Sequence, residues 1–368
     1  MSADAPWPWE AMEVLICVGP GGVGKTTLSA ALALTGALQG KKSLVCTVDP
    51  AKRLAQALGV ERLGNKETRL PAEFLAQAGI PSEASLWAMM LDMKHAWDEL
   101  IATYATPSQK VHIFNNRFYQ SLSSALAGSQ EYIAIEKLWE LSMCRDYGLL
   151  VLDTPPIAHA LDFLDAPNRL LGFLDTEASK RLFLPMLSAS KWGFRTWKAS
   201  NNLFLKTLSR FVGMQTLEQL SEFLLSMGQL YEGFRERARQ TQSLLTKPST
   251  AFVVVTTPQP ERMAQVQHFL EVLQKRNHHI AAVLVNQTHL PLEGQLAEGL
   301  RQLPAPLAKK MELAWGAHQQ QALEDTHALQ QLQALCRNIP LKVLPVLENT
   351  SSEMERLWHL SQILQRPS

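Results

Sequence analysis

Residues 19–27 read Gly-Pro-Gly-Gly-Val-Gly-Lys-Thr-Thr, and this run constrains the fold more than any other part of the chain. An apolar run at 14–18 precedes it and a helical pattern at 28–34 follows it. This order of strand, glycine loop and helix is typical of a phosphate-binding P-loop, in which backbone N–H groups and the positive end of a helix dipole surround an anion. The alternative, a glycine-rich turn that only joins a strand to a helix, accounts poorly for the full spacing.

The residues of this loop have distinct expected roles. Lys25 is expected to direct its charge towards the β- and γ-phosphates of a nucleotide, and the Thr26 hydroxyl is expected to bind Mg²⁺. The glycine-rich backbone is expected to bind phosphate oxygens. The predicted nucleotide-binding residues of the loop are Gly21, Gly22, Val23, Gly24, Lys25, Thr26 and Thr27.

Length and composition set limits on the class of protein. The 368 residues suffice for one large domain or two of ordinary size. A net charge of +1 gives no general signal for nucleic acid, and no nucleic-acid partner is expected. No apolar run is long enough to cross a bilayer and residues 1–10 lack the order of a signal peptide, so we predict a cytoplasmic location. The scattered cysteines and histidines predict no metal site built from side chains alone.

Several short runs are almost continuously apolar, which is typical of strands buried on both faces of a parallel sheet. The predicted strands are 14–18, 43–48, 86–91, 149–152, 251–256, 281–285 and 341–346. Helical patterns separate them, so we predict an α/β fold with a doubly wound, mostly parallel sheet. The sequence predicts one P-loop domain over 10–368, with helical insertions at about 92–148 and 164–248 because these connections are too long for simple crossovers.

Two aspartates follow predicted strands. Asp49 is expected at the carboxyl end of its strand, where a carboxylate can orient a water against the γ-phosphorus or accept its proton. An N-cap role is an alternative for Asp49, since proline and alanine follow it, and the two roles are compatible. Asp153 ends the apolar run 149–152, a Walker B pattern in which the carboxylate holds Mg²⁺ directly or through water. Lys25 and Asp49 are the predicted catalytic residues.

Two more strand ends carry candidate residues. The segment Thr154-Pro155-Pro156 predicts a stiff turn that can move as a unit between nucleotide states. Asn286 closes the strand at 281–285, and its amide offers both a donor and an acceptor to an adenine edge. A role for Asn286 in capping a turn fits the spacing nearly as well.

Four segments occur in the order found in one known family, namely the loop at 21–27, Thr47 to Ala51, Asp153 to Pro156 and Val285 to Gln287. Together they resemble the ArsA-type ATPases, which include the arsenite-pump ATPase and the tail-anchored-protein targeting ATPase, within the wider group that has a deviant Walker A motif. Segments at 126–131 and 160–164 further resemble the bacterial single-domain branch. The resemblance extends over essentially the whole chain.

The resemblance implies an ATPase that uses ATP and Mg²⁺ and forms a nucleotide-dependent dimer. Lys25 and Thr26 would bind phosphate and Mg²⁺, and Asp49 would position the attacking water. Asp153 would lie in the second switch. Asn286 and the loop after residue 346 would hold adenine. The helical insertions would form the effector side, where family members carry a client or a metalloid.

Residues 178–217 lie in the second insertion and contain lysines and arginines interleaved with aromatic residues, without any Asp or Glu. This pattern predicts an amphipathic surface for a hydrophobic protein client or a membrane face, so the protein would be peripheral to the membrane in the latter case. The alternative is an ordinary helical subdomain whose aromatic side chains form its core while the basic ones face water.

The chain departs from the family at positions that bear on its activity. Pro20 stands where the family has a signature lysine, which reaches the partner's nucleotide in relatives, and proline carries no charge and donates no hydrogen bond. The C-x-x-C zinc clasp of the targeting ATPase dimer is also absent. Besides a homodimer, the sequence therefore leaves open a catalytically weak regulatory subunit that pairs with a paralogue carrying the lysine. An arsenite-pump ATPase subunit is a further alternative, which the scattered cysteines oppose.

Overall fold

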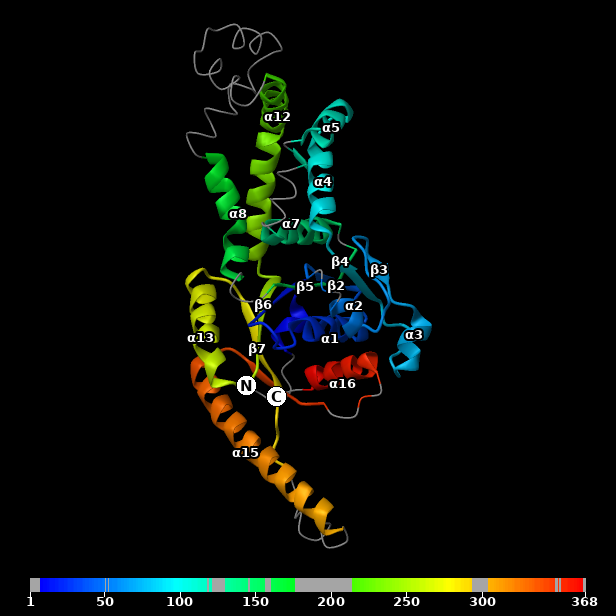
Figure 1. Ribbon diagram of the computed structural model, residues 1–368, viewed down its shortest axis with the longest axis vertical. Coiled ribbons are helices and arrows are strands. Elements are labelled where there is room, and N and C mark those ends of the chain that lie inside the picture. Colours follow the sequence, from blue (N-terminus) through cyan, green and yellow to red (C-terminus); the bar gives the residue numbers. More distant parts are fainter. Residues whose placement is uncertain are drawn as a thin grey trace. The chain divides into compact units, whose positions relative to one another are not determined.

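The computed structural model describes residues 7–49, 51, 53–117, 119–120, 130–144, 146–155, 160–175, 214–292, 304–347, 350 and 352–366. The chain divides into two compact units. The first comprises Met1–Met90, Leu141–Leu161 and Thr246–Ser368, and the second comprises Leu91–Glu140 and Asp162–Leu245. Figure 1 labels the helices and strands of both units.

The first unit is built on an eight-stranded sheet with the order β3-β4-β2-β5-β1-β6-β7-β8. All neighbouring strands are parallel except the pair β3 and β4. The strands are β1 Val14–Val18, β2 Ser43–Thr47, β3 Thr68–Arg69, β4 Leu86–Met90, β5 Leu149–Asp153, β6 Thr250–Thr256, β7 Ile280–Thr288 and β8 Leu341–Pro345. The predicted doubly wound α/β fold is confirmed, and all seven predicted strands are present.

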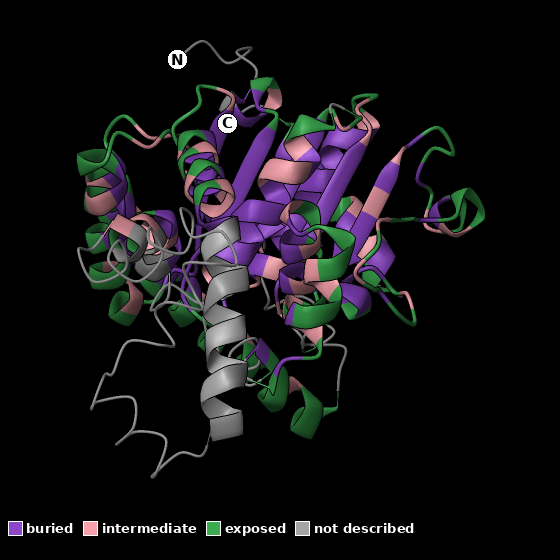
Figure 2. Cartoon of the chain, turned by 90° about the horizontal axis from the view of Figure 1, so that it is seen from above, coloured by how far each residue is buried: buried purple, intermediate pink, exposed green. Residues whose placement is uncertain are grey.

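The central strands are covered on both faces, as their apolar runs predict. Every residue of β1, β2, β5 and β6 is buried, and the sheet forms the buried centre in Figure 2. The sequence did not predict β3, because this strand has only two residues and both are exposed. It forms the antiparallel edge of the sheet beside β4.

Helices of the first unit pack around this sheet. Helix α1 is buried on almost every side, since it packs against α16 as well as β2 and β5 and consists mainly of alanine, leucine and threonine. Helix α13 packs on β6, and the carboxyl half of the long helix α15 packs beside β7. The helices are α1 Lys25–Leu38, α2 Arg53–Ala57, α3 Ala72–Gln77, α13 Pro260–Lys275, α15 Ala305–Cys336 and α16 Glu353–Gln365, with a short 3-10 helix at Pro8–Ala11.

The described part of the second unit is helical. Its helices are α4 Met93–Tyr104, α5 Pro107–Phe114, α7 Gln130–Met143, α8 Ala160–Asp175 and α12 Met214–Leu245. Trp97 of α4, Tyr132 of α7 and Ala238 of α12 share one apolar cluster, and Ile113 of α5 and Leu230 of α12 share another. These helices therefore bury apolar faces against one another within the unit.

Several predicted features lie outside the described residues. These are Pro156 of the proline turn, residues 126–129 of the family segment at 126–131, and residues 178–213 of the basic and aromatic stretch. Residues 214–217 of that stretch begin helix α12. In the part of the chain that the structure describes, no helix is long and apolar enough to span a membrane.

Candidate nucleotide-binding site

The phosphate loop connects β1 to α1, as predicted, and its shape depends on glycine. Gly22 and Gly24 have φ angles of +77° and +85°, in the left-handed region that favours glycine. A β-carbon at Gly19 would overlap the carbonyl oxygen of Val255 on the neighbouring strand β6. The loop can therefore follow this path only with glycine at these positions.

Lys25 is the first residue of α1, and its side chain folds back over the loop. Its ammonium group donates a hydrogen bond of 2.9 Å to the carbonyl oxygen of Pro20, and the residue is only 8% exposed. Burial lowers the pKa of Lys25, and the nearby carboxylate of Asp153 acts in the opposite direction. An anionic phosphate placed at this position would offer Lys25 the charge partner that the loop carbonyl does not supply.

Asp153 lies where β1, β5 and β2 end side by side. The strand register pairs it with Cys17 of β1 and with Thr47 of β2. Its Oδ2 atom accepts hydrogen bonds from the hydroxyl of Thr26, at 2.7 Å, and from the hydroxyl of Thr47, at 2.8 Å. The parallel register thus brings the Walker B carboxylate onto the threonine of the phosphate loop.

The second carboxylate oxygen of Asp153 is available to a ligand. Asp153 is 1% exposed, and its Oδ1 atom has no hydrogen-bond partner among the described residues. Burial raises the pKa of this carboxyl group above its usual value, against the effect of the hydrogen bonds from Thr26 and Thr47. A buried oxygen without a partner beside a threonine hydroxyl fits Mg²⁺ or a water of its hydration shell.

Asp49 is half-buried just beyond β2. Its Oδ1 atom accepts a hydrogen bond of 2.9 Å from the backbone N–H of Ala51, and its Oδ2 atom lies 3.4 Å from the guanidinium of Arg53. The backbone N–H of Asp49 donates to the hydroxyl of Thr47 at 3.2 Å. Helix α2 begins at Arg53, so Asp49 stabilises a turn before the helix and does not occupy the predicted N-cap position. Thr47 joins Asp49 to Asp153.

Asn286 lies on β7 next to the phosphate loop. Its amide nitrogen donates a hydrogen bond of 2.9 Å to the carbonyl oxygen of Val23, and the residue is 8% exposed. A β-carbon at Gly24 would overlap this amide nitrogen. Asn286 thus supports the loop in this structure, and its contact with adenine stays a prediction.

Three residues make contacts at this site that the sequence did not predict, although Thr47 and Thr154 lie in segments named above. Thr47 bridges Asp49 and Asp153, and the Thr154 hydroxyl donates to the carbonyl oxygen of Cys17 at 2.7 Å. Arg262, at the start of α13, donates from Nη1 to the carbonyl oxygen of Gly21 at 2.9 Å. The position of each threonine directly at a strand end was the available signal for the first two. No local signal marks Arg262, because 241 residues separate it from the loop.

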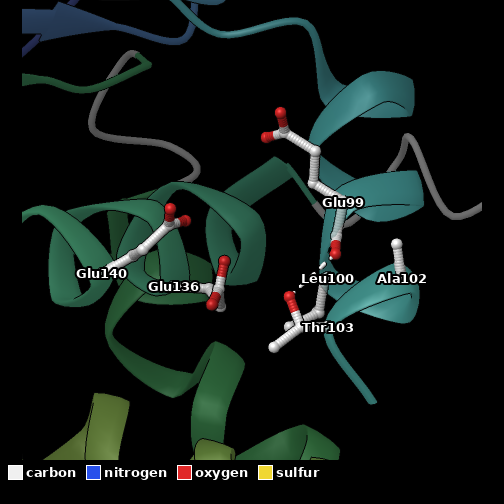
Figure 3. A pocket seen from close by; sticks show the side chains of 6 residues that line it. All are labelled: Glu99, Leu100, Ala102, Thr103, Glu136 and Glu140. Carbon is white, nitrogen blue, oxygen red and sulfur yellow. Dashed lines mark hydrogen bonds between the residues drawn. The ribbon is translucent and has the colours of Figure 1, made fainter. Parts of the chain in front are cut away.

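A cavity of about 330 Å³ in the second unit is of a different kind. Figure 3 shows the carboxylates of Glu99, Glu136 and Glu140 around it, with Leu100, Ala102 and Thr103. Lys137 lies 3.6 Å from Glu99 and 3.1 Å from Glu140, so their charges are partly balanced. A lining of carboxylates is unsuited to the phosphates of a nucleotide, so the phosphate loop is the candidate nucleotide site.

Comparison with known proteins agrees with the fold. The family model for anion-transporting ATPases of the ArsA type matches residues 12–366. The chain is 23% identical over 359 residues to ATPase GET3 of Malassezia globosa, which covers 97% of this chain and 92% of that protein. It is 25% identical over 355 residues to ATPase get3 of Aspergillus terreus, which covers 95% of this chain and 89% of that protein. The chain belongs to the ArsA-type ATPase family, and it is an ATPase.

Proposed function

We propose that the protein is a dimeric switch that binds ATP, hydrolyses it with Mg²⁺ and couples its nucleotide state to a hydrophobic client or a membrane partner. The observation that carries this proposal is the hydrogen-bonded chain from Thr26 through Asp153 and Thr47 to the backbone of Asp49. It connects the phosphate loop to two strand ends, so a ligand at the loop can affect both.

The residues of the site have distinct parts in the proposed reaction. Lys25 and the loop N–H groups bind the phosphates, and Lys25 stabilises the charge that develops on the γ-phosphoryl group. Thr26 and Asp153 would hold Mg²⁺, which neutralises phosphate charge when bound. To orient the attacking water, the Asp49 carboxylate would release its contacts with Ala51 and Arg53. Both contacts lie within one short, partly exposed turn, so the side chain can turn without disturbing the sheet.

The connectivity of the chain supports coupling to the second unit. After Asp153 the chain continues into α8, and after β4 it continues into α4. Both helices belong mainly to the second unit, and both connections leave the carboxyl ends of strands. Ligands of open parallel sheets bind at those ends, so a nucleotide would lie at strand ends from which the chain continues to α4 and α8.

Steady-state ATP hydrolysis by the purified chain tests the catalytic part of the proposal. We expect Mg²⁺-dependent turnover that falls at least about a hundredfold in Lys25→Ala and in Asp49→Ala, the scale of a lost catalytic group. Asp146→Ala is a matched control, since this carboxylate is exposed and lies 3.9 Å from Lys42 in a surface pair. Normal turnover in Asp49→Ala would remove the role assigned to Asp49.

Co-purification tests the coupling. Asp49→Asn should bind ATP without hydrolysing it, whereas Lys25→Ala should bind it poorly. A client that depends on the ATP state should therefore co-purify with Asp49→Asn and be depleted from Lys25→Ala. Equal recovery with both variants would contradict the proposed switch.

Pro20 favours one alternative function, a catalytically weak subunit that pairs with a paralogue. The residue contributes only a carbonyl oxygen, which is bound to Lys25, and it brings no charge to a partner. Rapid hydrolysis by the chain alone, as a homodimer, would count against this alternative.

The cysteines give no support to arsenite as a ligand. A trivalent arsenical requires two or three converging thiolates, and the described residues contain no group of three metal-binding side chains. Cys17 is buried, and burial raises the pKa of its thiol to about 12, so the thiolate is scarce at neutral pH.

A further inference from the structure

Arg262 reaches the phosphate loop from another element of the first unit. It lies in the first turn of α13, which follows β6, the neighbour of β1. Its Nη1 atom donates to the carbonyl oxygen of Gly21 at 2.9 Å, and its Nε atom donates to the side chain of Gln259 at 2.6 Å. The guanidinium is thus bound through Nη1 to the loop and through Nε to Gln259.

The position of Arg262 is not explained by the stability of its own helix. A positive charge in the first turn opposes the helix dipole, which favours an acidic residue there. Among the described residues, no carboxylate lies within ion-pair distance of the Arg262 guanidinium. The contacts that fix this side chain are therefore its bonds to Gly21 and to Gln259, the residue at the N-cap of α13.

The geometry of the peptide bond gives this contact a consequence for phosphate binding. In a planar trans peptide the C=O and the following N–H point in opposite directions. A donor that holds the carbonyl of Gly21 therefore turns the N–H of Gly22 to the other side. Asn286 holds the Val23 carbonyl in the same way, with the same effect on the N–H of Gly24.

The peptide between Gly21 and Gly22 has little else to keep it in place. Both glycines are exposed, and Gly22 has a φ of +77° with nothing within 4 Å of the point where a β-carbon would stand. A pair of glycines has more backbone freedom than any other pair of residues. The hydrogen bond from Arg262 is the side-chain contact that the described structure provides to this peptide.

We propose that Arg262 is a positioning residue of the ATPase site, which holds the Gly21–Gly22 peptide so that the Gly22 N–H faces the phosphates. The inference rests on the proposed nucleotide site at this loop. Arg262 acts through the loop backbone, so it affects ATP and ADP alike, and a neutral side chain that can still donate to the carbonyl replaces it in part.

Equilibrium binding of ATP and ADP, each with Mg²⁺, tests this role. Arg262→Met should weaken the binding of both nucleotides about tenfold, the scale of a hydrogen bond from a charged donor. Arg262→Gln keeps a donor without the charge and should bind within about threefold of the unmodified protein. Lys275→Met, which removes one exposed charge from the same helix, should leave both affinities unchanged.

Thermal unfolding of the same variants separates positioning from folding, and the midpoint of Arg262→Met should equal that of the unmodified protein. The inference is wrong if Arg262→Met binds both nucleotides normally, or if Arg262→Gln binds as weakly as Arg262→Met, because the charge rather than the hydrogen bond would then matter. Failure of the unmodified protein to bind either nucleotide would overturn the proposed site together with this inference. Normal binding by all variants would overturn only the role of Arg262.

Discussion

At the scale of single residues, Asp153 combines a cost to stability with a use in function. Burial raises the pKa of Asp153, so the ionised carboxylate is unfavourable in the folded protein. The free energy of unfolding therefore falls as the pH rises from the usual aspartate pKa through the raised pKa. We expect Asp153→Asn to raise the thermal midpoint by at least about 2 °C at pH 8 and to abolish Mg²⁺-dependent hydrolysis. Calorimetry and an ATPase assay on one preparation check both.

The variant Asp153→Ala provides the control for this prediction. Asparagine keeps an acceptor oxygen for Thr26 and Thr47, whereas alanine leaves the fully buried Thr47 hydroxyl without its acceptor. Asp153→Ala should therefore lower the midpoint. A midpoint that falls in Asp153→Asn as well would show that the ionised carboxylate stabilises the fold.

Gly19 carries a second prediction at the residue scale. A β-carbon at this position would overlap the Val255 carbonyl, so Gly19→Ala forces the loop and β6 apart. We expect a loss of about 1–3 kcal/mol in the free energy of unfolding, as for an overpacked core site, together with weaker ATP binding. Gly64→Ala is the matched control, because nothing lies within 4 Å of its β-carbon position. Urea unfolding that gives equal stabilities for the two variants would contradict the prediction.

How far the sequence predicts the site depends on the distance over which each contact forms. Lys25 and Thr26 follow from one local motif, and Asp153 follows from the end of an apolar run. The bond between Thr47 and Asp153 requires the parallel register of β2 and β5, which a single sequence does not specify. Local patterns therefore give the residue types of the site, while the register of the sheet gives its network.

At the scale of elements, the same distinction holds for the sheet. The central strands β1, β2, β5 and β6 are buried on both faces, and an unbroken apolar run is the direct consequence of that burial. Strand order leaves no such mark. Strand β3 at Thr68–Arg69 pairs with β4, but it is short and exposed. It therefore has no apolar pattern from which it could be predicted.

Helices α7 and α12 of the second unit carry a pH-dependent prediction. Burial raises the pKa of Glu136 on α7 to about 7, against the effect of Arg237 on α12, which lies 3.2 Å away. The charged groups that act on Glu136 are Arg237, Glu140, Lys137 and Glu99. Arg237 also stacks 3.9 Å from the ring centre of Trp139, so it keeps a partner when Glu136 is neutral.

The sign of the effect follows from proton binding. Between about pH 4.5 and 7 the folded state holds a proton on Glu136 that the unfolded state has lost, so stability falls as the pH rises through this window and is level above it. Relative to Glu136→Gln, the free energy of unfolding should fall by up to about 3 kcal/mol. Urea unfolding of both proteins from pH 4.5 to 8 measures this difference in the free energy of unfolding.

Glu131→Gln is the control for this pH series, because it removes a carboxylate from the same helix that is not among the groups acting on Glu136. Its stability should run parallel to that of the unmodified protein across the window. A constant difference between Glu136→Gln and the unmodified protein over the whole range would show that Glu136 is ionised throughout.

At the scale of the whole molecule, the chain joins a nucleotide-binding sheet to a helical unit through strand ends. Local motifs specify the first unit well, since phosphate chemistry demands fixed residue types at fixed spacing. The second unit is specified by apolar helix faces, which indicate burial but name no ligand. The sequence therefore predicts the ATPase far more fully than any partner.

The exposed Gly21 and Gly22 leave the outer side of the phosphate loop open, and a second copy that covers it would shield the triphosphate from water. We expect Asp49→Asn to double its mass in light scattering with ATP and Mg²⁺, and Lys25→Ala to remain a monomer under the same conditions. ADP should give a smaller fraction of dimer than ATP, because it lacks the γ-phosphate that the second copy would shield from water. A mass that stays monomeric with every nucleotide, in a chain that still binds ATP, would instead favour pairing with a paralogue that supplies the charge Pro20 lacks.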